Sequence, residues 1–361
     1  MRTITLLIAL LFTQCCFAQE SISFALPTNL SIGQNNACHK LHVIDMRTNK
    51  DTIGIVYAKP SNRKETKIIS EQPLDDLLSN YFDTISASKK GEYELLLVLH
   101  DFYIAKKLRT TDIGYFHFRG DFYIGKEGKY CMLDSVDRIY ELGRPIKNFT
   151  DTLIFYTQNT VFDLLNKYAA MPVNVELLKL TEQDARNRQE RLKAQYPIYT
   201  GDFKKGIYLT LEQFLSNSPA DTAVYVNEVL LEDRTRLYYY HYQNAKGKAG
   251  KKIYADEFFA IYCDGKWHLG GRDKDTRKMW YEHGEFIATR EMEGILPPGQ
   301  GNARTMANGA AAAFGLVGGA VAGVVTLPSP NEELTGRVIY LCRFDPAKKQ
   351  FIPMRRFSSA M

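Results

Sequence analysis

Residues 307–327 constrain this chain more than any other stretch, because they contain no charged side chain and repeat small residues at a fixed interval. Gly315, Gly319 and Gly323 recur at every fourth position, and Ala311 extends the row. Residues four apart share one face of a helix, so this glycine zipper predicts a groove into which another helix can press its backbone. We expect a helical segment whose zipper face contacts a membrane, a partner protein or a second copy of the chain.

The surroundings of the zipper leave three interpretations open. As a helix, the stretch from Ala310 to Leu327 would reach about 27 Å, just short of a hydrocarbon core of about 30 Å, and glycine is a poor helix former. Strand-like runs precede and follow the segment, and a single membrane span would separate them. The segment therefore packs against this protein or a second copy, associates with a membrane, or forms a loop.

The N-terminus has the pattern of a secretory signal peptide over residues 1–18. Arg2 precedes the apolar run from Ile4 to Phe12, and Ala18 provides a small residue before cleavage at Gln19. We therefore expect an exported protein that is periplasmic or associated with the outer membrane, with an extracellular location as an alternative. A lipidated Cys15 or Cys16 and an uncleaved anchor are further alternatives.

The charge of the chain excludes a nucleic-acid surface. The formal net charge is +5, and removal of residues 1–18 lowers it by one unit because Arg2 is lost. Acidic residues are interspersed with the basic ones, which is typical of a soluble surface. The basic run from Lys246 to Lys252 contains Gly247 and Gly250 and predicts a solvated hairpin tip, with contact to an anionic lipid or polysaccharide as the alternative.

Four cysteines remain after the predicted cleavage: Cys38, Cys131, Cys263 and Cys342. An oxidising envelope permits disulfides between them, and pairing within each half would suit two independent domains. Three of these cysteines lie in apolar strand-like runs, where a buried thiol is an equally good interpretation.

The length of the chain and a polar helical stretch near its middle predict two domains joined by a linker helix. Residues 172–200 contain the polar helical pattern from Thr181 to Gln195, in which Thr181 and Asp184 form a capping box. We expect an α+β domain over residues 19–171 and a mostly antiparallel β domain over residues 201–361, with the zipper inserted near its end.

The first domain should be an α+β sandwich. Apolar residues from Leu74 to Ile85 follow a helical period after Pro73, and a second short helix is predicted from Val161 to Tyr168. The predicted strands are 93–104, 114–124 and 130–133, with residues 125–128 as a hairpin connection.

The second domain should be mainly antiparallel sheet. Thr210 and Gln213 fit a capping box before a short helix, and Asp264-Gly265 is the strongest hairpin signal in the chain. The predicted strands are 223–231, 236–243, 257–263, 266–269, 285–289, 337–344 and 350–356.

Two family resemblances accompany these patterns. The run Val43-Ile44-Asp45-Met46-Arg47, the amphipathic helix and the run Glu94 to Leu99 resemble in order the small periplasmic auxiliary lipoproteins of envelope complexes, over roughly residues 38–170. The strand, short helix and Asp-Gly hairpin of residues 200–361 resemble a module in uncharacterised secreted proteins of Bacteroidota type. These resemblances imply an envelope compartment and an α+β fold, and no activity.

No catalytic, metal or nucleotide motif stands out in the sequence, so we predict no cofactor and no metal. The chain lacks a His-Glu-x-x-His helix, a Gly-x-Ser-x-Gly elbow and a phosphate-binding glycine loop. Cys38, His39 and His42 offer metal-ligating atoms without an identifiable fourth ligand. His100-Asp101, at the end of a strong strand, is the best candidate for proton transfer.

The aromatic run from Tyr238 to Tyr242 places Tyr238, Tyr240 and Tyr242 on one side of a strand. Cross-strand packing explains this row, and stacking on sugar rings is the alternative. We therefore predict a non-catalytic, exported interaction protein that associates with the envelope, self-associates or contacts a membrane through its glycine zipper. The competing hypothesis is a secreted hydrolase or carbohydrate-binding protein that uses the tyrosine row or His100-Asp101.

Overall fold

The computed structural model describes residues 21–32, 36–59, 62–86, 91–107, 113–143, 148–230, 236–271, 277–293 and 337–356. The predicted signal peptide and the glycine zipper lie outside these residues. About 23% of the chain is helix and 46% is strand, mostly in antiparallel sheets, so the fold class is α+β as the sequence predicted.

The chain forms two compact units that divide between Ala185 and Arg186, a position inside the segment predicted as a linker. The first unit contains the described residues up to Ala185. The second unit contains the described residues from Arg186 to Glu293 and those from Arg337 onward, so it is built from two separate stretches of sequence. Each unit is described by itself.

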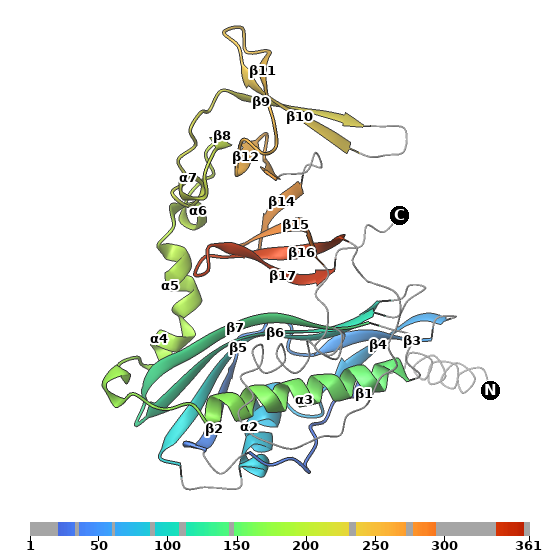
Figure 1. Cartoon of the computed structure of the whole chain (residues 1–361), viewed down its shortest axis with the longest axis vertical. Coiled ribbons are helices and arrows are strands. Elements are labelled where there is room, and N and C mark those ends of the chain that lie inside the picture. The colour runs from blue at the N-terminus through green and yellow to red at the C-terminus, as the bar shows by residue number, and fades with distance from the viewer. Residues whose placement is uncertain are drawn as a thin grey trace, which may run out of the picture. The chain divides into compact units, whose positions relative to one another are not determined.

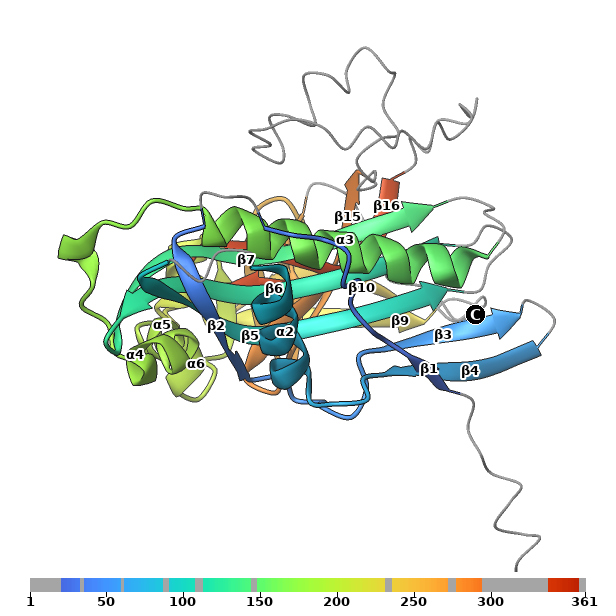
Figure 2. The same ribbon diagram turned by 90° about the horizontal axis from the view of Figure 1, so that it is seen from below.

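The first unit contains one mixed sheet and two long helices among its described residues. The elements are β1 (Ser21–Ser23), β2 (Cys38–Asp45), β3 (Gly54–Lys59), β4 (Asn62–Ile69), α2 (Leu74–Ile85), β5 (Tyr93–Lys107), β6 (Ile113–Lys126), β7 (Lys129–Gly143), α3 (Phe149–Ala169) and the 3-10 turn η1 (Val175–Leu177). The strand order is β1-β4-β3-β5-β6-β7, and β2 also pairs with β5. Both helices lie on the same face of this sheet (Figure 1, Figure 2).

Alternation along the central strands gives this sheet two different faces. Leu95, Leu97 and Leu99 of β5 belong to the core that the helices cover. Leu96 and Val98 point to the opposite face, where they pack in a smaller apolar cluster. Farther along the strands, that second face becomes polar, and it carries the first candidate site.

Helix α2 lies where the sequence predicted it, whereas helix α3 differs from its predicted length. Helix α2 begins directly after Pro73 and buries the predicted apolar stripe. Helix α3 is much longer than the segment predicted from Val161 to Tyr168. Its first half is amphipathic only weakly, because Thr157 and Thr160 occupy buried positions, where their hydroxyls donate to backbone carbonyls one turn earlier.

The second unit contains two antiparallel sheets and several short helices among its described residues. The elements are α5 (Arg188–Ala194), α6 (Pro197–Thr200), β8 (Gly206–Tyr208), α7 (Leu211–Leu215), β9 (Val224–Leu230), β10 (Arg236–Gln243), β11 (Ala249–Ile253), β12 (Ala260–Cys263), β13 (Lys266–Leu269), β14 (Arg277–Glu282), β15 (Glu285–Glu293), β16 (Arg337–Asp345) and β17 (Gln350–Arg356). The larger sheet has the order β17-β16-β15-β14-β13-β12-β8, and the smaller one has the order β11-β10-β9.

The linker pattern folds into two helices rather than one. α4 (Glu182–Arg186) precedes α5, and Asn187 separates them. The predicted capping box forms, because the Thr181 backbone N–H donates to Asp184 Oδ2 at 2.9 Å and the Asp184 N–H donates to Thr181 Oγ1 at 3.1 Å.

Both predicted hairpin turns are present. Glu127 and Gly128 have φ values of 54° and 73°, and Asp264 and Gly265 have values of 50° and 75°. Two consecutive positive φ angles are typical of the type I′ turn, which matches the twist of the flanking strands.

Among the described residues, no helix combines the length and the apolar character that crossing a membrane requires.

Candidate functional site

The polar part of the first sheet brings His100, Asp121 and Ser135 together from three neighbouring strands. His100 Nε2 lies 3.2 Å from Asp121 Oδ2, and the Ser135 hydroxyl donates to Asp121 Oδ1 at 2.6 Å. The side chain of Asp121 is buried. A bulge in β5 between Leu99 and Asp101 shifts the register at this point, so the sequence alone did not place His100 beside β6.

A second group on the same strands centres on the buried His117. Its Nδ1 lies 2.7 Å from Asp101 Oδ2, and its Nε2 lies 2.9 Å from Asp137 Oδ1. Burial lowers the pKa of His117, but the charge of Asp101 and the hydrogen bonds to both carboxylates outweigh burial and raise the pKa to about 9. The imidazolium therefore holds a proton at neutral pH and bridges two strands.

The order of these groups determines their chemistry. In a hydrolase triad the imidazole lies between the carboxylate and the hydroxyl, so that it can accept the hydroxyl proton. Here the carboxylate of Asp121 lies between His100 and Ser135, and the hydroxyl donates to an acid. His117 donates through both ring nitrogens when protonated, which leaves it no lone pair for a general base.

The metal-ligating atoms that Cys38, His39 and His42 offer do not form a cluster in the structure. On β2, Cys38 is buried and His39 is exposed, and His42 Nδ1 lies 3.8 Å from Glu182 Oε2. Burial, followed by the charge of Glu94, raises the pKa of the Cys38 thiol to about 12. The described residues contain no cluster of three or more ligating side chains.

The four cysteines considered for disulfides, Cys38, Cys131, Cys263 and Cys342, are all free thiols in the structure. Cys38 on β2 and Cys131 on β7 are separated by β5 and β6, which places them about 14 Å apart at normal strand spacing. Cys263 on β12 and Cys342 on β16 are separated by three strands. A disulfide spans less than about 7 Å between Cα atoms, so neither pairing within a half forms in this fold.

The second unit contains a cavity of about 360 Å³ at the tip of the β12–β13 hairpin, which we call the aromatic cavity. Its lining consists of Phe203, Tyr238, Tyr262, Gly265, Lys266, Trp267, His268, Met279, Trp280 and Tyr281. The ring of Phe203, from the loop after α6, lies 5.2–5.5 Å from the rings of Tyr262, Trp267 and Tyr281. This loop thereby holds rings from three strands in one cluster.

The electrostatics of the aromatic cavity are close to neutral. Burial, with a contribution from the nearby Lys266, lowers the pKa of His268 to about 4, so this imidazole is uncharged at neutral pH. The Lys266 ammonium donates to Glu228 Oε2 at 2.9 Å. The indole N–H of Trp267 is buried and has no hydrogen-bond partner among the described residues.

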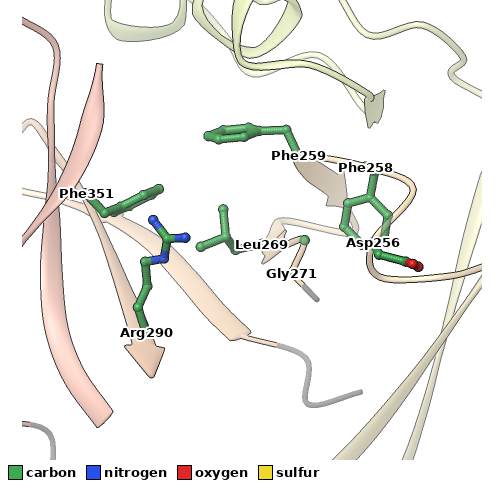
Figure 3. A pocket seen from close by; sticks show the side chains of 8 residues that line it. Asp256, Phe258, Phe259, Leu269, Gly271, Arg290 and Phe351 are labelled. Carbon is green, nitrogen blue, oxygen red and sulfur yellow. The ribbon is translucent and has the colours of Figure 1, made fainter. Parts of the chain in front are cut away.

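A smaller cavity of about 160 Å³ lies elsewhere in the second unit, between β13, β15 and β17. Figure 3 shows Arg290 beside the ring of Phe351, and the guanidinium carbon lies 5.5 Å from the ring centroid. Gly270 forms part of its wall, and a side chain at this position would collide with the carbonyl oxygen of Phe258. This cavity is smaller than the usual range of small-molecule sites, about 300–1,000 Å³.

The tyrosine row is divided between the core and the aromatic cavity. Tyr240 is buried in the cluster between the two sheets of the second unit, and Tyr238 and Tyr242 pack against it. Cross-strand and sheet packing therefore accounts for the row, and Tyr238 alone also lines the aromatic cavity. The zipper residues Ala311, Gly315, Gly319 and Gly323 lie outside the described residues, so their role stays a prediction.

Sequence reasoning missed the other rings of the aromatic cavity. They come from positions 203 to 281, on one loop and three strands, and no local spacing connects them. The available signal was the tryptophan content, because both tryptophans of the chain, Trp267 and Trp280, line this cavity.

No family model matches the chain, and no curated protein matches it. Two solved structures are similar over part of it. One is the crystal structure of an uncharacterized protein, with 12% identity, 42% of this chain and 97% of that chain covered, and a TM-score of 0.25. The other is a DUF330-family protein from Xanthomonas campestris, with 11% identity, 41% and 91% covered, and a TM-score of 0.26. Neither supports the lipoprotein or the Bacteroidota resemblance, and both resemblances stay predictions.

Proposed function

We propose that this protein is a non-catalytic, exported interaction protein of the cell envelope. The observation that carries the proposal is the order of groups in the first unit, where Asp121 separates His100 from Ser135. The strand residues most suited to proton transfer are used to hold β5, β6 and β7 together. The competing hydrolase hypothesis would need the imidazole of His100 to lie between the carboxylate of Asp121 and the hydroxyl of Ser135.

Export is supported by the signal-peptide pattern of residues 1–18. Envelope association and self-association are supported by the glycine zipper, since Gly315, Gly319 and Gly323 would share one helix face. Binding of carbohydrate is a second candidate function, and the aromatic cavity of the second unit specifically favours it.

A fluorophosphonate probe tests the non-catalytic part, because it labels serines that a base has activated. We expect the full-length protein to remain unlabelled between pH 6 and pH 9. Labelling that disappears in Ser135→Ala would show an activated hydroxyl and overturn the proposal. Ser218→Ala, which changes an exposed serine in the second unit, is the matched control.

Fractionation of the native host tests the envelope part. We expect the full-length protein in the envelope fraction after an alkaline carbonate wash, and a variant lacking residues 308–327 in the soluble fraction. Recovery of the full-length protein from the cytoplasm would contradict export. Equal extraction of both proteins by the wash would contradict a membrane role for the zipper.

Light scattering tests self-association separately. Gly319→Leu fills the predicted groove and should reduce the oligomer to a monomer, whereas Ala313→Leu, off the zipper face by sequence spacing, should not. An unchanged mass in Gly319→Leu would refute this role of the zipper.

A further inference from the structure

The lining of the aromatic cavity combines stacking surfaces with open access. The side chains of Phe203, Tyr262, Trp280 and Tyr281 are neither fully buried nor fully exposed. Rings in a folded core are normally covered by other side chains, whereas rings at the edge of an opening keep a surface available for a ligand. The volume of about 360 Å³ lies within the range of small-molecule sites, about 300–1,000 Å³.

The opening exists because β13 is shorter than β14. Strand β13 begins at Lys266, directly after the turn at Gly265, and it pairs with β14 from Trp267 to Leu269. Trp280 and Tyr281 lie on β14 beyond the last of these pairs, at the tip of the β12–β13 hairpin. Because successive residues of a strand point to opposite faces, Tyr281 lies with the ring of Phe203 on one face and Trp280 lies on the other, and both line the cavity.

The charge of the cavity argues for an uncharged ligand. Its two basic side chains are Lys266, which is paired with Glu228, and His268, which is neutral because its pKa is lowered to about 4. A carboxylate or phosphate ligand would have to displace the pairing with Glu228. A cationic ligand would meet the ammonium group of Lys266.

The polar atoms among the rings argue for a ligand that both donates and accepts hydrogen bonds. Tyrosine hydroxyls from Tyr238, Tyr262 and Tyr281 can do either, a neutral imidazole offers an acceptor, and the indole N–H of Trp267 is a buried donor without a described partner. A proline-rich peptide would also stack on aromatic rings, but proline has no N–H to donate. Sugar hydroxyls donate and accept, and the C–H face of a pyranose ring stacks on aromatic side chains.

We propose that the aromatic cavity is a binding site for a neutral pyranose oligosaccharide, with Trp280 as the principal stacking surface. This inference adds a ligand to the proposed interaction protein and does not depend on its glycine zipper. Binding takes place without cleavage of the sugar chain.

Tryptophan fluorescence reports this site directly, because the two tryptophans of the chain both line the cavity. We would titrate the full-length protein with maltotetraose, cellotetraose and chitotetraose and record the emission. At least one sugar should give a saturable blue shift. Trp280→Ala should weaken its binding at least tenfold by calorimetry, Trp280→Phe should keep it within about threefold, and Tyr254→Ala, which removes an exposed tyrosine outside the cavity, should leave it unchanged.

Three results would overturn the proposal. They are the absence of a shift with all three sugars, a shift produced by a decaproline peptide instead, and unaltered sugar binding in a folded Trp280→Ala variant. Chromatography of the sugars after incubation separates this inference from the proposed function. Cleaved products would refute the non-catalytic function and leave the binding site in place, whereas intact sugars without binding would refute only the site.

Discussion

Replacement of His117 by glutamine should remove a pH-dependent part of the stability of the first unit. The pKa of His117 rises from 6.5 to about 9 on folding, which corresponds to about 3 kcal/mol of folding free energy at about 1.4 kcal/mol per pKa unit. Because the folded state binds the proton more tightly, this stabilisation is complete below pH 6.5 and is lost as the pH rises to about 9. Glutamine keeps a hydrogen-bonding side chain but has no proton to bind.

The difference in stability between wild type and His117→Gln should therefore fall from about 3 kcal/mol at pH 6 to near zero above pH 9.5. Urea unfolding must separate the two units, since a two-unit chain need not unfold in one step. Both tryptophans lie in the second unit, so their emission follows that unit alone, and the remaining change in far-UV circular dichroism follows the first unit.

The matched control is His283→Gln, because the His283 side chain is 85% exposed in the second unit. It should leave the pH dependence of the first unit unchanged. A stability difference for His117→Gln that stays constant from pH 6 to pH 9.5 would refute the reasoning, since it would show that His117 does not titrate between its two carboxylates.

Three further predictions concern the second unit and the thiols. Gly270→Ala should lower the free energy of unfolding of the second unit by about 1–3 kcal/mol, because the added Cβ would meet the Phe258 carbonyl. The control Gly201→Ala meets nothing closer than 3.6 Å and should change that free energy by less than about 0.5 kcal/mol. Urea unfolding followed by tryptophan emission measures both, and equal midpoints for the two variants would contradict this prediction. Acidification from pH 6.5 to pH 4 should destabilise the second unit, because the pKa of His268 is lowered in the folded state and the unfolded state therefore binds a proton first. His268→Gln should reduce this dependence of the unfolding free energy on pH. An unchanged dependence in the variant would argue against a buried neutral imidazole. Maleimide should modify Cys131 before Cys38, Cys263 and Cys342 in the native protein, because these three thiols are buried. Mass spectrometry after denaturation without reductant should find all four of these cysteines modified; a protected pair among them would reveal a disulfide.

Local patterns in the sequence predicted the elements whose stabilisation is local. The apolar stripe of α2 and the turns at Glu127-Gly128 and Asp264-Gly265 are fixed by residues within one or two turns of chain, and all three were found where predicted. Strand β14 was missed because its side chains do not alternate cleanly between polar and apolar. Its place in the sheet comes from pairing with β13 and β15.

The candidate sites depend on register between strands, which the sequence does not display. His100 was singled out from the sequence, but its partner Asp121 lies on the next strand and became visible only with the bulge in β5. The aromatic cavity needs Phe203 beside Trp267, and these two residues lie far apart in sequence, one before β8 and the other on β13. The type of a side chain can single out a residue such as His100 from the sequence. It cannot show which side chains on neighbouring strands contact that residue, and these contacts determine its role.

The discontinuous second unit also has a consequence for the order of synthesis. Strand β15 pairs with β16, yet residues 294–336 must be made before the first residue of β16 appears. Until then β15 presents an open edge, the kind of surface that invites pairing with other chains. The rings of the aromatic cavity, in contrast, are all made by residue 281. A nascent chain would thus complete its ligand site before it can close its sheet, and a ligand or chaperone that binds early would protect the unit during the interval in which it is most prone to aggregate.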